Sequence, residues 1–244
     1  MAERPREERI TNAFVELADT LVGDFDAIHF LDRLVEHCLD LLDIAAAGVI
    51  LATPLGDLMD AAATDRRTRA LEEAGLHWGE GPLVDCYRTG RPVANAALDD
   101  DQALHHWPRY TLRARRLGFV SHSALPLRLR AQTIGALSLY RDQPGLLDPA
   151  QLSLGQALAD IATIGILQQH TGAEQPPVAV HLHAAMQDRL LIEQAIGFLA
   201  ERADLTPDES FVRMRTHSRA QRRPLTEVAR QVLDDAFDAA APDG

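Results

Sequence analysis

The sequence predicts an α+β domain built on an antiparallel sheet, followed by a smaller all-α domain of three helices. Three observations lead to this prediction. Strand-like runs alternate with amphipathic helical stretches over residues 8–172. A segment of Gly, Pro and small residues, 173–180, then predicts a semi-rigid linker. Beyond it, over residues 181–240, only helical periodicity is found.

The charged residues exclude several kinds of chemistry. The chain has 244 residues and no lysine, so all 24 basic residues of the Lys and Arg class are arginine. A phosphate-binding P-loop and Schiff-base catalysis both need a lysine, and both are therefore excluded. The net charge of −12 argues against indiscriminate nucleic-acid binding, so any such binding must come from a local basic patch.

The number of cysteines and the lengths of the apolar runs restrict the cysteine chemistry and the expected location of the protein. Cys38 and Cys86 are the only cysteines, too few for a disulfide framework or a four-ligand zinc site. No run of 18 apolar residues is present, which predicts no membrane helix. The first ten residues are charged, with no apolar segment behind them, which predicts no signal peptide. The expected location is the cytoplasm.

The first domain begins with helices and a hairpin. Helical spacing covers residues 8–22, and Asp26 is positioned to cap a second helix. The run 46–53 reads as a buried strand, and residues 58–64 return beside it after a turn. A helix over 66–78 follows. Pro82 and Gly90 then fit the first residue and the left-handed cap of a short helix.

The second half of this domain closes the sheet. An acidic loop precedes one helix that carries Trp107, Tyr110 and four arginines. The alternating segments 120–127 and 133–141 are joined by a link short enough for a hairpin. Asp148 and Pro149 then start a long helix, with an Asp cap and proline at the first position.

This order of elements, together with the strings GEGPLVDCYRTGRPV and GALSLYRDQPGLLDPAQ, resembles a GAF domain over residues 8–172. The resemblance implies a small-molecule sensor whose ligand lies between the sheet and the helical insertion. The corresponding pocket is bounded by Trp78, Cys86, Trp107, Tyr110, His122 and Ser123. An ordinary core lined by aromatic and His side chains remains open as the alternative.

The sequence restricts what such a pocket does. The cyclic-nucleotide members of the GAF family need an Asn-Lys pair that this chain lacks, and Leu83 stands where similar members often carry a cysteine. Some GAF folds reduce methionine sulfoxide with cysteines, but Cys38 and Cys86 lie 48 positions apart. His105 and His106 have no visible third ligand for a metal. We expect no catalytic residue, no metal and no cofactor.

The last domain has strong helix signals and a small core. A helix from about His181 to Ala203 turns Ile192, Ile196 and Leu199 inward. Thr206 opens a capping box for a second helix, which buries Phe211 and Met214, and Pro224 starts the third. So small a core favours a partner, which we expect to be a second copy of the chain. The stripe Leu182, Met186 and Leu190 suits the seam of that dimer.

Arginines gather on the second of these helices and the turn after it. Between residues 210 and 233 the chain has six Arg and one acid, a net charge of 6 − 1 = +5. Arg215 and Arg219 are four residues apart and share a helix face. Arginine pairs with phosphate and stacks on unpaired bases, so the predicted RNA-binding residues are Arg213, Arg215, Arg219, Gln221, Arg222 and Arg223. A solvated helix face is the alternative.

The same stretch resembles an ANTAR domain, the RNA-binding module of bacterial transcription antiterminators. The resemblance is carried by Ile192 to Leu199 (IEQAIGFL), Asp208 to Phe211, Met214 to Ser218, Arg222 to Leu225, and Val228-Ala229. Two positions depart from the family pattern. Ile196 stands where a lysine is common, which implies one phosphate contact fewer. Arg222 stands where an asparagine is common, which implies weaker reading of base edges.

The two resemblances together imply a cytoplasmic, dimeric, non-enzymatic regulator. A GAF sensor with an unidentified small-molecule ligand would control an ANTAR domain that binds paired RNA hairpins in nascent leader transcripts, in possible contact with RNA polymerase. One alternative is a ligand-sensing protein whose helical tail serves only dimerisation or partner docking. Another is a DNA-binding helix-turn-helix, which the absence of a tight Gly turn disfavours.

Overall fold

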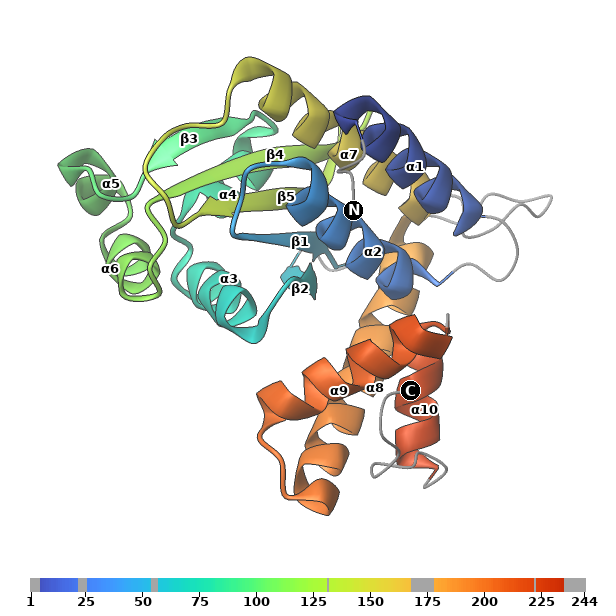
Figure 1. The fold of residues 1–244 in the computed structure, drawn as a ribbon. Helices are drawn as coiled ribbons and strands as arrows, with labels where there is room; N and C mark the ends of the chain where they lie inside the picture. Colours follow the sequence, from blue (N-terminus) through green and yellow to red (C-terminus); the bar gives the residue numbers. More distant parts are fainter. Residues whose placement is uncertain are drawn as a thin grey trace.

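The computed structural model describes residues 5–21, 26–53, 57–130, 132–167, 178–221 and 223–234. In the helix that begins at Val178, side chains are described from Met186 onward. We call residues 5–167 the sheet domain and residues 178–234 the helical domain. The predicted α+β class is confirmed: an antiparallel sheet with flanking helices is followed by a purely helical region (Figure 1).

The sheet has five antiparallel strands in the order β2-β1-β5-β4-β3. Both predicted hairpins are confirmed, since β1 pairs with β2 and β4 pairs with β5. In the centre of the sheet, Val49 of β1 lies opposite Leu137 of β5. The strand bounds are β1 (Ala46–Ala52), β2 (Leu58–Ala63), β3 (Val93–Ala97), β4 (Ser121–Leu129) and β5 (Gln132–Arg141).

Helices cover both faces of the sheet (Figure 1). One face packs against α1 (Arg6–Asp19), α2 (Ala27–Leu41) and α7 (Pro149–Leu167). The other carries α3 (Arg66–Trp78), α4 (Pro82–Thr89), α5 (Asp101–His106) and α6 (Pro108–Arg116). Side chains alternate between the two faces along each strand, so the sheet supplies apolar residues to both helical layers. Leu125 of β4 packs against the α1, α2 and α7 layer, and Ala124 packs on the opposite face.

The local signals in the sequence produced the predicted helix ends. Asp26 accepts a hydrogen bond of 2.9 Å from the His29 amide and so caps α2. Asp148 and Gln151 accept from each other's amides at the start of α7, as a capping box requires. Pro82 is the first residue of α4, and Gly90 ends it in the left-handed conformation with φ 64°.

One predicted helix is in fact two. Trp107 was expected inside a single helix with Tyr110, but it lies between α5 and α6 with φ −130° and ψ 69°. The cause is Pro108, because a proline disfavours helical backbone at the residue before it. The interruption turns α6 to run along α3, and it places Trp107 at the corner rather than on a helix face.

Among the described residues, α7 is the one helix long and apolar enough to cross a membrane by length and composition. Its 19 residues include polar side chains, and Leu158, Ala162 and Ile166 are buried in the core shared with α2 and the sheet. The core helix of a soluble protein passes the same test, so one such helix is weak evidence for a membrane span.

The helical domain consists of α8 (Val178–Ala203), α9 (Pro207–Gln221) and α10 (Leu225–Leu233). Its small core is the predicted one, with Ile192, Leu199, Phe211, Met214 and Val228 at most 2% exposed. α8 begins at Val178, within the segment 173–180 that the sequence assigns to the linker. Residues 173–177 lie outside the described residues.

The two domains are docked along α2 and β2 (Figure 1). α2 contacts both α8 and α10, and α8 also contacts β2 and α7. A single apolar cluster contains core residues of both domains, including Leu31 of α2 and Ile192 of α8. The docking places the arginine-bearing helix α9 next to the sheet domain, at its junction with α2 and the β2–α3 turn.

Candidate nucleic-acid interface

The orientation of α9 is set by its cap and its buried face. Thr206 Oγ1 accepts from the Glu209 amide at 3.2 Å, and Glu209 Oε2 accepts from the Thr206 amide at 2.7 Å, which confirms the predicted capping box. Phe211 and Met214 are buried against α8 and α10. With this face turned inward, Arg215 and Arg219 point toward the sheet domain.

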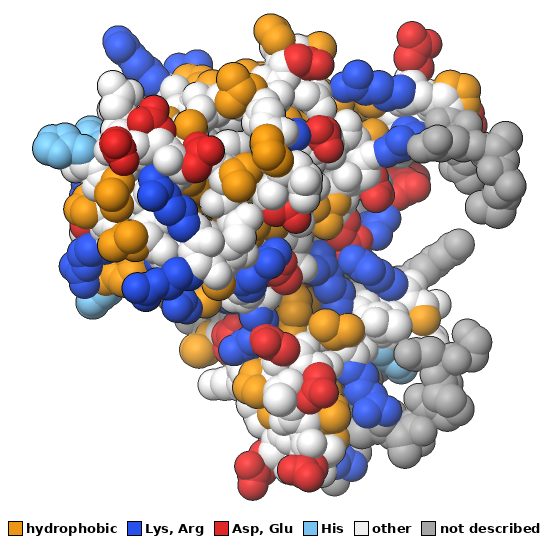
Figure 2. Space-filling model, turned by 60° about the vertical axis from the view of Figure 1, so that its left-hand side comes forward, with side chains coloured by type: hydrophobic (Ala, Val, Ile, Leu, Met, Phe, Trp, Pro, Cys, Tyr) orange, Lys and Arg blue, Asp and Glu red, His pale blue; other side chains and the backbone are white. Residues whose placement is uncertain are grey.

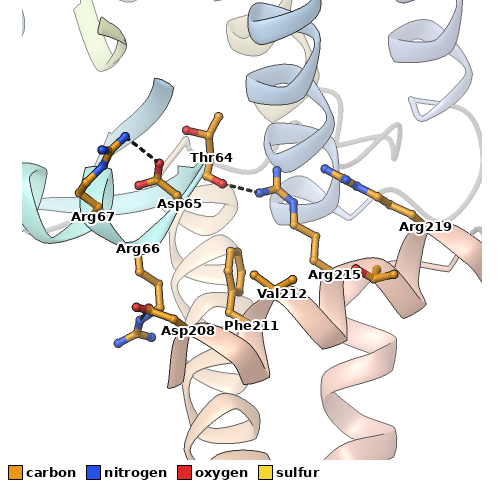
Figure 3. Close-up of a pocket in the computed structure, with 10 residues that line it drawn as sticks. Thr64, Asp65, Arg66, Arg67, Asp208, Phe211, Val212, Arg215 and Arg219 are labelled. Carbon is orange, nitrogen blue, oxygen red and sulfur yellow. Dashed lines mark hydrogen bonds and ion pairs between the residues drawn. The ribbon is translucent and has the colours of Figure 1, made fainter. Parts of the chain in front are cut away.

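Arg215 contacts the sheet domain at a carboxylate and at a backbone carbonyl, and Figure 3 shows the second of these contacts, with Thr64. Its Nε donates to Glu36 Oε1 of α2 at 2.9 Å, and its Nη2 lies 2.8 Å from the same oxygen. Its Nη1 donates to the backbone carbonyl of Thr64 at 2.8 Å. The side chain is only 11% exposed. Arg215 therefore presents no nitrogen to an outside ligand in this arrangement.

Arg219 shares the same carboxylate. Its Nε lies 3.1 Å and its Nη2 2.5 Å from Glu36 Oε1, while 51% of its side chain stays exposed. The prediction that Arg215 and Arg219 share a face is confirmed by this common partner. Burial favours the neutral form of Glu36, but the charges of Arg215 and Arg219 prevail and lower its pKa below the ordinary value.

The other predicted RNA-binding residues lie at the end of α9 and in the turn after it. Gln221 and Arg223 are exposed, and Arg213 is half-buried. Arg223 Nη1 lies 3.7 Å from Glu227 of α10. Arg222 lies outside the described residues. The turn itself is held by Ser218, whose Oγ donates to the Arg223 carbonyl at 2.6 Å. Arg219, Gln221 and Arg223 thus form the accessible part of the predicted set.

Ile196, for which the sequence predicts one phosphate contact fewer, lies inside the molecule. It is 2% exposed and packs in the core of the helical domain. It therefore adds no charge to the basic surface, and the loss of a phosphate contact stays a prediction.

A cavity of about 420 Å³ opens between the two domains beside these arginines (Figure 3). Its walls come from the β2–α3 turn on one side and from α9 on the other. Figure 2 shows basic and acidic side chains gathered at this waist of the molecule. The lining residues are Thr64, Asp65, Arg66, Arg67, Asp208, Phe211, Val212, Arg215, Thr216 and Arg219.

The arginines of this cavity are already paired with acids of the chain. Arg66 Nε lies 2.6 Å from Asp208 across the junction, and Arg67 Nη2 lies 3.7 Å from Asp65. A second, more buried group of ions lies next to it: Arg69 binds Asp60 at 2.7 Å and Glu193 of α8 at 3.4 Å, and Arg189 of α8 lies 3.7 Å from Asp60. The junction is therefore held by paired charges as well as apolar contacts.

Sequence reasoning missed the acidic side of this junction. Asp32 and Glu36 are one helical turn apart on α2 and both face arginines. Burial raises the pKa of Asp32 to about 6, against the opposing charges of Arg215, Arg69 and Arg189. The sequence does show two acids four residues apart, Asp32 and Glu36, next to the apolar stripe of α2. Without knowledge of the docking, that pattern is typical of any half-exposed helix.

The six residues predicted to bound a small-molecule pocket do not occur together in any of the four cavities found here among the described residues. Tyr110 and His122 do meet: the Tyr110 hydroxyl lies 2.7 Å from His122 Nδ1, and both side chains are buried. Tyr140 stacks on His122 with ring centroids 4.2 Å apart. Burial lowers the pKa of His122 to about 3, so the ring is neutral at physiological pH. These aromatic side chains fill the space as a core does.

The other residues make different contacts, although Trp107 packs against the apolar cluster that contains Tyr110. Ser123 follows His122 on β4 and therefore faces the opposite side of the sheet, where it donates to Asn95 Oδ1. Trp78 lies under the Arg109 guanidinium, at 4.7 Å. Trp107 Nε1 donates to Asp85 at 2.9 Å and lines a separate cavity of about 880 Å³ beside β3, α4 and α5.

The cysteines and histidines that suggested other chemistry are also separated. Cys38 of α2 packs in the core on one face of the sheet, and Cys86 of α4 packs on the other face. Burial raises the pKa of each thiol to about 12, so both are protonated at neutral pH. His106 pairs with Asp85 at 3.0 Å. Within the described part of the chain, no three His, Cys, Asp or Glu side chains are placed to hold a metal ion.

Two family models match the chain. The model described as "GAF domain" matches residues 26–166, more than half of the chain, and the model described as "ANTAR domain" matches residues 180–233. A search of the curated proteins found no match.

Several of the solved structures similar to the chain are GAF domains. One is from an Acinetobacter phosphoenolpyruvate-protein phosphotransferase (14% identity, 75% of this chain and 97% of that chain, TM-score 0.49). Another is from the corresponding Coxiella burnetii protein (13%, 65% and 93%, 0.47). A third is from a putative membrane protein of Geobacter sulfurreducens (18%, 64% and 97%, 0.46).

The sheet with its two helical layers and the arginine-bearing three-helix region thus coincide with the two matched models. The chain belongs to the GAF domain family and carries an ANTAR domain at residues 180–233.

Proposed function

We propose that the protein is an RNA-binding transcription antitermination regulator, in which the GAF domain controls an ANTAR domain that binds paired hairpins in nascent transcripts. The observation that carries the proposal is the ANTAR match over 180–233 on helices whose accessible end presents Arg219, Gln221 and Arg223. Regulation, signal transduction and RNA binding follow from the two domains. The proposal goes beyond these properties in assigning antitermination as the activity and RNA hairpins as the target.

The chemistry of this surface suits RNA. A guanidinium donates to phosphate oxygens and stacks on unpaired bases, and bases in hairpin loops are accessible where the edges of an RNA duplex are not. Binding one RNA fold prevents the competing terminator hairpin only to the extent that the protein prefers that fold. In this role the protein acts without catalysis, in the cytoplasm, near RNA polymerase.

The proposal includes a homodimer. Leu190 of α8, Phe198 of α8 and Val212 of α9 are large apolar side chains with 54%, 41% and 61% exposure. Leu190 belongs to the predicted seam with Met186, while the side chain of Leu182 lies outside the described ones. Two copies joined along α8 would present two basic surfaces, as a pair of hairpins requires.

An electrophoretic shift with a two-hairpin leader RNA tests the RNA-binding part. We expect salt-dependent binding that weakens in Arg219→Ala and Arg223→Ala and persists in Arg91→Ala, an exposed arginine on the sheet domain. Duplex DNA that competes equally would point to a helix-turn-helix instead. Transcription through a leader terminator, with and without the protein, tests antitermination.

A second candidate function is favoured by the engagement of Arg215 and Arg219 with Glu36. In that version the helical domain only docks on the GAF domain or a partner, and the arginines are structural. It predicts that RNA binding is absent, or is unchanged in Arg219→Ala and Arg223→Ala. The same shift experiment therefore separates the two functions.

A further inference from the structure

We propose that the docked arrangement is a closed state in which Glu36 of the GAF domain occupies the RNA-binding arginines, and that the two domains must separate at this junction before RNA is bound at full affinity. The inference rests on the proposed function, because it concerns the regulation of the same arginine surface. The device is an intramolecular contact between α2 and α9.

The first argument is the burial of Arg215 against oxygens of the GAF domain. Each of its three side-chain nitrogens is within 3 Å of an oxygen of the GAF domain, and 11% of the side chain is exposed. A phosphate oxygen cannot reach a guanidinium in this position without displacing Glu36 and Thr64. In the docked state Arg215 is thus removed from the RNA-binding surface.

The second argument is the chemical likeness of the occupant and the ligand. Glu36 presents an anionic oxygen to Arg215 and Arg219 together, as a backbone phosphate oxygen does when two arginines bind it. Its side chain is 13% exposed, and its pKa is held low, so it stays ionised over the neutral pH range. Glu36 and RNA therefore compete for the same two guanidinium groups.

The third argument is the character of the junction. Much of it is ionic: Arg66 with Asp208 at its rim, and Arg69, Asp60, Glu193 and Arg189 in its interior. Removing charges from water offsets much of the attraction within such pairs, so a junction of this kind holds a defined arrangement at little net gain in stability. The junction also contains apolar contacts, such as those of Ile192, and interfaces between domains of one chain separate more readily the more polar they are.

The size of the effect follows from the population of the open state. The apparent dissociation constant equals the intrinsic one divided by the fraction of molecules that are open. If about one molecule in a hundred is open, full release would tighten binding about a hundredfold, and partial release about tenfold. A ligand of the GAF domain would act on RNA binding by changing this fraction.

The test is the full-length Glu36→Gln protein, which keeps the side-chain size and removes the charge. The matched control is Glu16→Gln, because Glu16 also binds Arg33, at 2.9 Å, but the structure gives it no contact with α9. We expect Glu36→Gln to bind the two-hairpin RNA about tenfold more tightly than wild type, and Glu16→Gln to bind like wild type. Glu36→Gln combined with Arg215→Ala should lose the gain.

A second readout does not depend on RNA. Small-angle scattering should show a larger radius of gyration for Glu36→Gln than for Glu16→Gln and wild type. Arg66→Ala removes the Arg66–Asp208 contact at the rim of the junction and should change both readouts in the same direction by less. If Glu36→Gln does not fold, Arg66→Ala still tests the closed state with both measurements.

The outcomes separate the two proposals. If wild type and the charge variants bind RNA equally, while Arg215→Ala weakens all of them, the closed state is overturned and the RNA-binding function stands. If no variant binds RNA although Glu36→Gln expands the protein, the RNA-binding function fails and the junction remains an opening device. If radius and affinity are both unchanged, the closed state is rejected outright.

Discussion

Glu36 Oε1 lies 2.8 Å from Arg215 Nη2 and 2.5 Å from Arg219 Nη2, although Glu36 precedes these arginines by 179 and 183 residues. One carboxylate of the GAF domain thus holds two arginines of the ANTAR domain. The contact joins the sensor to the proposed RNA-binding surface directly.

The accessible arginines should determine the salt dependence of RNA binding. Each arginine that neutralises a phosphate contributes about 0.7 to 0.9 to the slope of log affinity against log salt concentration. We therefore expect Arg219→Ala and Arg223→Ala each to reduce the slope by about 1, and Arg91→Ala to leave it unchanged. Titrations at four salt concentrations give the slope. Equal slopes in all four proteins would contradict the assignment.

Asp32 should make folding stability depend on pH. Its pKa is raised to about 6 mainly by burial, so the folded protein binds the proton more tightly than the unfolded chain does. Stability from this group is therefore present at low pH and is lost as pH rises from about 4 to 6. Asp32→Asn should gain stability relative to wild type, and the gain should be about 2 kcal/mol larger at pH 7.5 than at pH 4.5.

Denaturant unfolding of both proteins at the two pH values measures this gain. Taking the difference between variant and wild type cancels the other titrating groups that the variant leaves unchanged, such as His37. A gain of the same size at both pH values would show that Asp32 is not the titrating group.

Thr206 should stabilise the helix that carries the arginines. Its hydroxyl accepts from the Glu209 amide and its amide donates to the Glu209 carboxylate. Replacement by alanine should lower the free energy of unfolding by about 1 kcal/mol. Thr216→Ala, an exposed position on the same helix, is the control and should change stability by a few tenths at most. Thermal unfolding compares the two, and equal losses would argue against the cap.

Two glycines should respond in opposite ways to alanine. A Cβ at Gly135 of β5 would clash with the Ile50 carbonyl oxygen, so Gly135→Ala must push the central strands apart. We expect a loss of about 3 kcal/mol or more. Gly197 of α8 has open space around it, and alanine there should add about 0.5 to 1 kcal/mol through helix propensity. Urea unfolding measures both, and stabilisation by Gly135→Ala would contradict the strand register.

The sequence by itself determined the elements and the order in which they occur. Caps such as Asp26, Asp148 and Thr206 act on amides three residues away, so their effect is readable from neighbouring residues. The inward stripe of α8 and the sharing of one face by Arg215 and Arg219 follow from helical periodicity. Pro108 is a local signal of the same kind, because a proline disfavours helical backbone at the residue before it, where α5 ends and α6 begins.

The tertiary structure alone decided which surfaces meet. The sequence placed Tyr110 and His122 near a pocket, but only packing showed that Tyr140 fills the space beside them. It placed arginines on α9 without indicating that a carboxylate on α2 binds them. Such contacts depend on how two domains dock, a geometry set by the whole apolar junction and its paired charges. No local pattern in either segment encodes that geometry, and so Glu36 became visible only once the chain was folded.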